Sequence, residues 1–382
     1  MSHDWLLALL RRHLGSPEPL PPPPPGIEPI AVAEGLAGLA AEYLDKGGVE
    51  HPALLRRRQH QFAYAAKLAG VQEVLGGELA AAGCEAMLLK GAALLEGPYR
   101  DAKGRRPLSD LDLLIRPHQS KKVARTLQRL GLVRLDPGRW RGDGFEIDLH
   151  RDLLGMDGQG LAELSPFSVD EEGLWWRSRP AKNGGPSLRV ADLVDQILHL
   201  AIHGQKHAFC RLVWLLDLAL LLPQADPAAL LARAKEWRAE RALAAALDLL
   251  EKELGQPVPP ELPALVSALN RCEQAWLAAI RRRQPGPPIG LGRVVAGFAL
   301  PRLGQRLRYW WAILFPASRV LATKYPRASR WQAAFGHLRT SVAPRLWEAV
   351  TALSWERGRP ARSSPDAGGT PALPAKGSRH GG

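Results

Sequence analysis

The sequence is poor in cysteine, and this scarcity limits the classes of protein to which the chain can belong. Only three cysteines occur among 382 residues, Cys84, Cys210 and Cys272, and they lie far apart without a Cys-x-x-Cys pair. Small secreted domains depend on several disulfides, and cysteine-based zinc sites need paired ligands. We therefore expect reduced thiols in a cytoplasmic protein, with no disulfide framework and no zinc site built on cysteine.

Long apolar runs are also missing. A bilayer-spanning helix needs roughly 20 consecutive apolar residues, and the best candidate, 212–222, is interrupted by Asp217. The first residues carry Asp4 early and Arg11 and Arg12 late, the reverse of the basic-then-apolar order of a secretory signal. The sequence therefore predicts neither a transmembrane segment nor secretion.

Acidic residues are scarce in one part of the chain. The formal net charge is +13, but residues 281–382 hold 18 Lys or Arg and three acids, a net charge of +15. The first 280 residues, with 33 basic and 35 acidic side chains, carry −2. A basic C-terminal third could contact RNA, an anionic membrane or an acidic protein surface. A solvated helical surface explains the same charge, and both interpretations stay open.

Proline, glycine and the hydrophobic period divide the chain into segments. Five consecutive prolines at 21–25 predict an extended linker that cannot be core. Apolar residues three and four apart predict helices before residue 84 and after residue 190. The predicted segments are a short helix (1–16), a Pro-rich linker (17–29), a helical segment (30–84), a core (85–155), a helical domain (190–283), a basic Trp-rich helical region (284–355) and a disordered tail (356–382).

Within the predicted core the hydrophobic period changes to that of strands. The predicted strands are 87–89, 108–115, 132–135, 139–141 and 145–150, and the predicted helices are 91–96 and 117–130. The order strand, helix, strand, helix and then strands predicts an α+β fold. We expect a small mixed sheet with helices on one face, flanked by N-terminal helices and a C-terminal helical domain.

Two aspartates on one predicted strand indicate a metal site. Alternate side chains of a strand project to the same face, so Asp110 and Asp112 point together while Leu111 and Leu113 enter the core. Adjacent carboxylates repel each other unless a cation lies between them. Oxygen ligands favour magnesium or manganese. An exposed edge strand with alternate acids is the common alternative explanation of this pattern on its own.

A second predicted strand carries more acids. The same alternation places Glu146, Asp148 and His150 on one face. If the two strands are neighbours, three or more carboxylates converge. Paired divalent ions held by such a cluster can bind a triphosphate, stabilise the leaving pyrophosphate and activate an attacking oxygen. This is the chemistry of nucleotidyl transfer.

Upstream of the aspartates the sequence offers groups that suit phosphate. Lys90 and Gly91 lie at a predicted strand-to-helix turn, where backbone N–H groups and the helix dipole favour an anion. The following loop holds Arg100, Arg105 and Arg106, whose guanidinium groups match triphosphate oxygens.

These motifs resemble the nucleotidyltransferase superfamily that includes DNA polymerase beta and kanamycin nucleotidyltransferase. The chain is most similar to a bacterial branch that carries Leu-Lys-Gly at the turn, Arg-Pro-x-[Ser/Gly]-Asp-x-Asp at the strand and an acid-apolar-His strand. The corresponding residues here are Leu89-Lys90-Gly91, Arg106-Pro107-Leu108-Ser109-Asp110-Leu111-Asp112 and Asp148-Leu149-His150. Toxin-type nucleotidyltransferases with Lys-Gly-Gly at the turn are also similar.

The resemblance implies roles for individual residues. Asp110 and Asp112 would bind two magnesium or manganese ions, and Asp148 would be the third carboxylate and the base toward the acceptor hydroxyl. Lys90 and Gly91 would contact phosphate. Arg106, four residues before the first aspartate, and Ser109, where the family often has a small polar residue, complete the implied nucleotide-binding set. Gly91 is followed by Ala92, so the hydroxyl or second glycine of the superfamily turn is missing.

Three further features have more than one interpretation. His199, His203 and His207 recur every four residues on one face of a predicted helix, where they could bind metal, contact nucleotide or acceptor, or line a domain interface. Asp217, in an apolar helix, is expected to pair with a cation such as Arg211 because an unpaired buried carboxylate is costly. The C-terminal cations and aromatics suit nucleic acid, a membrane surface or packing.

The sequence thus predicts a metal-dependent enzyme that transfers NMP from an NTP to an acceptor hydroxyl and releases pyrophosphate. The acceptor could be a small molecule, a protein or RNA, including a tRNA end. The alternative is a catalytically inactive relative that binds RNA or an anionic membrane through its basic C-terminal region.

Overall fold

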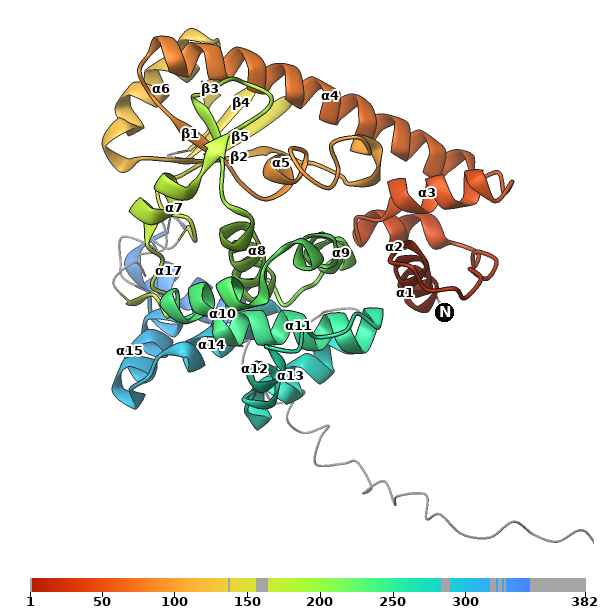
Figure 1. The fold of residues 1–382 in the computed structure, drawn as a ribbon. Coiled ribbons are helices and arrows are strands. Elements are labelled where there is room, and N and C mark those ends of the chain that lie inside the picture. The colour runs from red at the N-terminus through yellow and green to blue at the C-terminus, as the bar shows by residue number, and fades with distance from the viewer. Residues whose placement is uncertain are drawn as a thin grey trace, which may run out of the picture.

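The N-terminal part of the chain is helical. In a computed structural model, which describes residues 2–136, 138–155, 164–282, 289–316, 321, 325 and 328–343, four helices precede the first strand (Figure 1). They are α1 (Ser2–His13), α2 (Ile27–Ala33), α3 (Ala37–Lys46) and α4 (Pro52–Ala81). Proline suits the first turn of α4 because its missing N–H would have no helical partner there.

The predicted Pro-rich linker is partly core, contrary to the expectation for 17–29. Helix α2 begins at Ile27, whose side chain is only 1% exposed. The proline run itself is held against α1, because Trp5 Nε1 donates a hydrogen bond of 2.8 Å to the Pro21 carbonyl. The prolines therefore connect α1 to α2 along the protein surface, and the segment does not separate two bodies.

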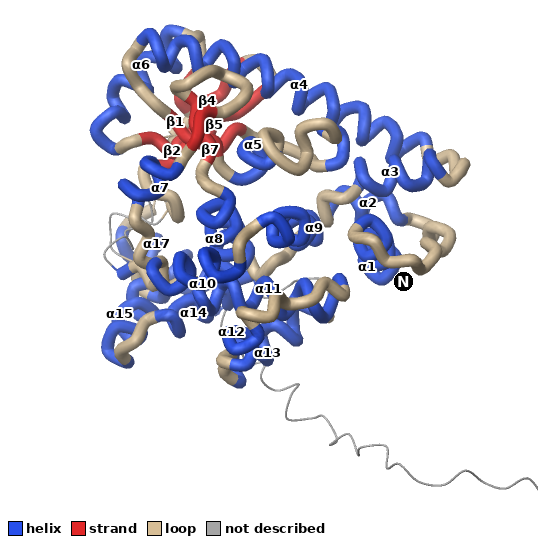
Figure 2. Tube along the Cα trace, in the orientation of Figure 1, coloured by secondary structure: helices blue, strands red, loops and turns tan. Residues whose placement is uncertain are grey.

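A mixed sheet of seven strands lies at the centre of residues 86–190 (Figure 2). Its strands are β1 (Ala86–Leu88), β2 (Leu111–Ile115), β3 (Val133–Arg134), β4 (Arg139–Gly142), β5 (Phe145–His150), β6 (Arg179–Pro180) and β7 (Leu188–Val190). The spatial order is β3-β4-β5-β2-β1-β7-β6. The predicted α+β class and mixed sheet are confirmed.

Two details of the sheet differ from the prediction. Strand β2 begins at Leu111, so Asp110 precedes the strand instead of lying within it. The sheet also continues beyond residue 155, because β7 pairs in parallel with β1 and β6 pairs with β7. No element was predicted for residues 156–189, so both β6 and β7, a strand of only three residues, were missed.

Both faces of the sheet are packed, whereas the sequence predicted helices on one face only. Leu111, Leu113 and Ile115 pack in a cluster with residues of α4 and of α6 (Ser120–Arg129). Met87 and Leu114, on the opposite face, belong to the larger cluster built mainly by the C-terminal helices. Figure 1 shows α4 along one side of the sheet and the C-terminal helices on the other. Asp112 alternates with Leu111 and Leu113 and therefore faces these helices.

The described C-terminal part of the chain is helical, as predicted. Its helices are α8 (Leu193–Lys206), α9 (Leu212–Leu221), α10 (Pro227–Glu236), α11 (Glu240–Leu254), α12 (Pro263–Ser267), α13 (Arg271–Arg281), α14 (Ile289–Ala296), α15 (Leu303–Leu314) and α17 (Arg330–His337). Arg238, which lies between α10 and α11, has a left-handed φ of 54°. Two short helices complete the core, α5 (Lys90–Leu94) and α7 (Glu171–Arg177).

No individual helix of the described residues is long and apolar enough to cross a bilayer. The required length and apolar composition are met only by a pair of helical segments that are bent by 119° relative to each other, Leu212–Gln224 and Pro227–Glu236. The predicted disordered tail, 356–382, and the end of the basic region lie outside the described residues.

Candidate metal and nucleotide site

Asp112 and Asp148 lie directly opposite each other on neighbouring strands. Strands β2 and β5 are parallel, and their register pairs Asp112 with Asp148 and Leu114 with His150. Paired residues of adjacent strands project to the same face at close range. Ligand atoms of Asp112, Asp148 and His150 all lie within 4.8 Å of one another, a spacing that could hold a metal ion. The predicted convergence of two acidic strands is therefore confirmed for Asp112 and Asp148.

Asp112 is the electrostatic centre of this group. It is buried, with 7% of its surface exposed, and Oδ1 lies 2.6 Å from Lys90 Nζ and 2.8 Å from His150 Nε2. Burial alone raises the pKa of this carboxyl, but the hydrogen bond from His150 and the charge of Lys90 outweigh it and lower the pKa to about 2. Asp112 is therefore an anion at neutral pH that attracts cations.

His150 has a different partner from the one considered in the sequence. The sequence placed His150 on one face of its strand with Asp148, so that it could either orient Asp148 or simply end the strand. Its Nε2 contacts Asp112 at 2.8 Å and lies 3.6 Å from Asp148 Oδ2. The imidazole thus links the two carboxylates.

We name Asp110, Asp112, Asp148 and His150 together the acidic group. Asp110 lies at its edge. Its Oδ1 accepts a hydrogen bond of 2.8 Å from Ser109 Oγ, and the Ser109 carbonyl accepts one of 2.9 Å from Tyr64 on α4. Burial, and then the charge of Asp112, raise the pKa of Asp110. Asp110 is not one of the three residues whose ligand atoms cluster within 4.8 Å. Its role as a metal ligand stays a prediction, and so does the contact of Ser109 with nucleotide.

Lys90 and Gly91 lie where β1 leads into α5. Lys90 has a φ of 47°, a left-handed conformation that is uncommon for residues with a side chain and often marks functional sites. Its ammonium group binds Asp112. A Cβ atom at Gly91 would collide with the guanidinium of Arg106 and the side chain of Leu108. A side chain at this position would therefore displace the ends of both neighbouring side chains.

Arg106 is engaged inside the protein. Its Nε and Nη2 donate to Asp217 at 2.9 and 2.8 Å, and its Nη1 donates to the Pro107 carbonyl at 3.2 Å. Tyr99 also donates to Asp217, at 2.8 Å. The expected pairing of Asp217 with a cation is therefore confirmed, but the cation is Arg106. Arg211, the example named from the sequence, donates from Nε to the Ala33 carbonyl. The contact of Arg106 with phosphate stays a prediction.

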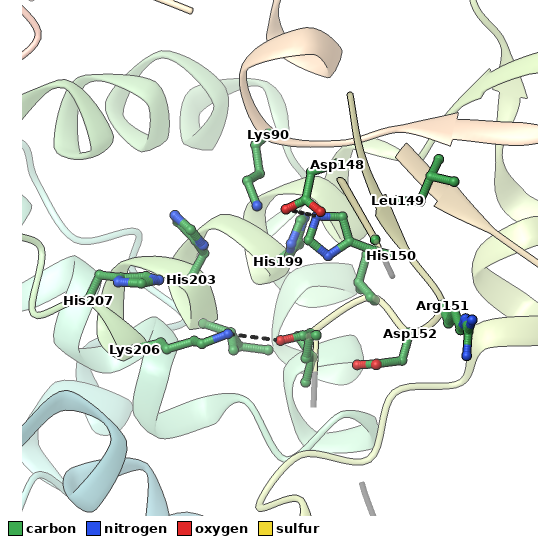
Figure 3. A pocket seen from close by; sticks show the side chains of 15 residues that line it. Lys90, Asp148, Leu149, His150, Arg151, Asp152, His199, His203, Lys206 and His207 are labelled. Atoms are coloured by element: carbon green, nitrogen blue, oxygen red, sulfur yellow. Dashed lines mark hydrogen bonds and ion pairs between the residues drawn. The ribbon is translucent and has the colours of Figure 1, made fainter. Parts of the chain in front are cut away.

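Two cavities meet at this site. The Lys206 cavity, of about 460 Å³, is lined by residues that include Asp148, His150 and Lys206 (Figure 3). The Tyr64 cavity, of about 700 Å³, is lined by residues that include Asp110, Asp112, Gly91, Arg57 and Tyr64. Both cavities share Lys90 and His203.

His199 and His203 of α8 and His207, which follows its last residue, line the Lys206 cavity, and His203 also lines the Tyr64 cavity. Their rings follow one another at centroid distances of 6.5 Å (His199 to His203) and 4.7 Å (His203 to His207), and His203 contacts Trp214 at 5.1 Å. Burial is the main cause that lowers the pKa of His199 to about 3, that of His207 to about 4, and that of His203 well below its usual value. The three rings are neutral at physiological pH.

Several lining residues were not selected from the sequence. Arg57 and Tyr64 of α4 and Lys206 of α8 line the cavities although they lie far along the chain from the aspartates. Lys206 directly precedes His207, the last of the three regularly spaced histidines. This adjacency in the sequence is the signal that could have identified Lys206 as a site residue. Arg105, expected near phosphate, binds Glu42 at 2.6 Å.

The comparison with protein families agrees with the geometry. The family model described as uncharacterised nucleotidyltransferase matches residues 28–255, more than half of the chain. The protein therefore belongs to this nucleotidyltransferase family. No match was found among curated proteins or among solved structures. The matched range extends from α2 to the C-terminal end of α11 and includes the sheet, the acidic group and the α8 histidines.

Proposed function

We propose that this nucleotidyltransferase is an active, metal-dependent enzyme that transfers NMP from an NTP to an acceptor hydroxyl. The observation that carries the proposal is the register of β2 and β5, which brings the Asp112 and Asp148 carboxylates and His150 within 4.8 Å of one another. Family membership supports the reaction type.

The donor set fits a divalent ion. The clustered carboxylates of Asp112 and Asp148 offer the oxygen ligands that magnesium and manganese prefer. We propose these two aspartates and Asp110 as the metal ligands. The ammonium group of Lys90 already lies beside the Asp112 carboxylate, which supports the proposal that this buried anion also binds a metal cation. When bound, the ion would neutralise triphosphate charge and stabilise the leaving pyrophosphate.

The residues of the chain have separate tasks in this proposal. Lys90 and the backbone at Gly91 bind phosphate oxygens in the Tyr64 cavity. Asp148 accepts the proton of the acceptor hydroxyl, whose oxygen attacks the α-phosphorus in line. Arg106 acts as a positioning residue, because it fixes Asp217 of α9 against the segment that leads to Asp110.

Calorimetry with each NTP tests the proposal directly. Magnesium-dependent binding of one or more NTPs is expected, together with transfer of an α-³²P label to a component of cell extract. Absence of nucleotide binding with and without magnesium would contradict the proposal and favour an inactive relative.

A second function is favoured by a specific surface, which we name the α15 stripe. Leu303, Leu307, Trp311 and Phe315 follow one another at intervals of four residues and are 64, 55, 65 and 47% exposed. Arginines flank them, and α17 carries the exposed Trp331 and Phe335. Exposed aromatics beside cations are typical of helices that lie in the interface of an anionic membrane. We propose such a contact as an addition to catalysis.

Vesicle flotation tests the membrane contact. The protein is expected to float with vesicles of phosphatidylcholine and phosphatidylglycerol, and Trp311→Ala combined with Leu307→Ala is expected to reduce the bound fraction. Trp176→Ala is the matched control, because Trp176 of α7 is 85% exposed outside the stripe. Equal binding by the variant, or binding to RNA alone, would contradict the contact.

A further inference from the structure

The two cavities divide the acidic group between them. Asp148 and His150 line the Lys206 cavity, whereas Asp110 and Asp112 line the Tyr64 cavity. Lys90, which binds Asp112, lines both. A substrate in one cavity and a substrate in the other would therefore meet at the acidic group.

The chemistry of each wall indicates which substrate it suits. The Tyr64 cavity contains the Gly91 turn, the cations Arg57 and Arg211, and the aromatic rings of Tyr64 and Trp214. These groups match the phosphates and the base of a nucleotide. A proton acceptor must lie within hydrogen-bond reach of the hydroxyl that it serves. Because Asp148 lines the Lys206 cavity, an acceptor that gives its proton to Asp148 must lie in that cavity.

Lys206 gives this second cavity a positive wall. Figure 3 shows its side chain extending toward the same space as Lys90, from the side opposite to it. The ammonium donates a hydrogen bond of 3.1 Å to a backbone carbonyl, that of Leu154. Burial, and then repulsion by Arg293 and Lys90, lower the pKa of Lys206 to about 8, with a smaller opposing effect of Asp152. The neighbouring histidines are neutral and do not add charge.

We infer that the Lys206 cavity is the acceptor site and that it takes a small-molecule alcohol bearing an anionic group, a phosphate or a carboxylate. The inference rests on the proposed function and specifies its acceptor. A volume of about 460 Å³ is in the range of small-ligand pockets. Lys206 binds the anionic group, while the rings of His203 and His207 offer N–H donors and flat faces beside it.

The reaction at this site balances without another reagent. The acceptor oxygen forms a bond to the α-phosphorus of the NTP, and the bond from that phosphorus to the oxygen bridging to the β-phosphate breaks. Pyrophosphate leaves with the electron pair, and the hydroxyl proton passes to the carboxylate of Asp148.

Fractionation of the acceptor tests its class. A cell extract is divided into molecules below and above about 3 kDa, a cut-off larger than any ligand that a cavity of this size can enclose. The small fraction is then passed over an anion-exchange resin, and each part is incubated with the protein, magnesium and α-³²P-labelled NTP. Label is expected in the small molecules that the resin retains. Label only in macromolecules, or only in the unretained fraction, overturns the inference but leaves the proposed function standing. No label in any fraction overturns both.

Substitution of Lys206 tests the site, with the active fraction as the acceptor. Lys206→Met is expected to raise the KM for acceptor at least about tenfold, as loss of a charged hydrogen bond predicts, and Lys206→Arg is expected to recover part of that loss. The Kd for NTP, measured by calorimetry, is expected to stay within about twofold. Lys235→Met, at an exposed position of α10, is the matched control. An equal rise in the Kd for NTP, or an unchanged KM for acceptor, overturns the assignment.

Discussion

Lys90 Nζ lies 2.6 Å from Asp112 Oδ1, so a lysine from the turn after β1 occupies one side of the carboxylate at the centre of the acidic group. Removing this lysine leaves His150 as the remaining described partner of Asp112 at hydrogen-bond distance. We expect Lys90→Met to lower the free energy of unfolding by about 1–3 kcal/mol when metal is chelated, because a buried charge loses its partner. Added magnesium is expected to stabilise the variant more than the wild type.

Urea unfolding at pH 7.5, with EDTA or with magnesium, measures both effects. Lys46→Met is the control, since the Lys46–Glu42 pair has a largely exposed lysine and such pairs contribute at most about 1 kcal/mol. A variant as stable as the wild type in EDTA would contradict a stabilising role of Lys90.

The acidic group gives a prediction about catalysis. Asp112→Asn and Asp148→Asn are each expected to reduce label transfer by at least about 100-fold, because each removes a charge at which metal and reacting atoms meet. Glu146→Gln is the matched control: Glu146 lies on the same strand as Asp148 but binds Arg141 at 2.7 Å. Retained activity in either aspartate variant, with normal folding by circular dichroism, would remove that residue from the mechanism.

The ion pair of Arg106 and Asp217 gives a prediction about stability. Arg106→Met alone is expected to cost about 3–5 kcal/mol, because it leaves Asp217, which is fully buried, without its cation. Replacing the group together, as Arg106→Met, Asp217→Leu and Tyr99→Phe, is expected to cost less than the single substitution. Chemical denaturation of both variants measures the difference, and an additive or larger loss in the combined variant would contradict the interpretation.

The buried histidines predict a loss of stability in mild acid. His207 has its pKa lowered to about 4 by burial and by Lys206 and Arg293. Between about pH 6.5 and pH 4 the unfolded chain binds a proton at this residue and the folded chain does not. The free energy of unfolding therefore falls as the pH falls through this window, by at most about 1.4 kcal/mol per pH unit for each such histidine.

Comparison of His207→Gln with the wild type isolates this contribution. The variant is expected to show a shallower decrease in unfolding free energy between pH 6.5 and 4, because glutamine does not titrate. Raised pKa values of Asp110 and Asp195 act in the opposite direction but cancel in the difference. Parallel pH curves would show that His207 is protonated in the folded protein.

The sequence predicted those parts of the site that depend on local periodicity. Strand β5 was predicted with the bounds Phe145–His150, and the alternation of acids along it correctly placed Asp148 and His150 on the face of Asp112. The family resemblance found from Leu89-Lys90-Gly91 and the Asp-x-Asp strand was also confirmed. Each of these signals lies within a few consecutive residues and needs no knowledge of tertiary structure.

The missed features depend on contacts between distant segments. Strand β7 has three residues and is defined by pairing with β1, about 100 residues earlier, so it shows no alternation of its own. Arg106 and Arg211 were both available to Asp217, and only the packing of α9 decides between them. Lys206 likewise joins the site because α8 crosses the face that carries Asp148.

The connection between β7 and α8 limits how the cavities can open. Strand β7 ends at Val190 beside β1, and α8, which carries the histidines and Lys206, begins at Leu193. Lys90 follows β1 just as closely. Only Ala191, which is buried, and Asp192, which caps α8, lie between the strand and the helix, so the N-terminal end of α8 is held close to the sheet beside Lys90. Substrate entry and product release are therefore expected to proceed through side-chain and loop movements, without closure of whole lobes around the bound substrates.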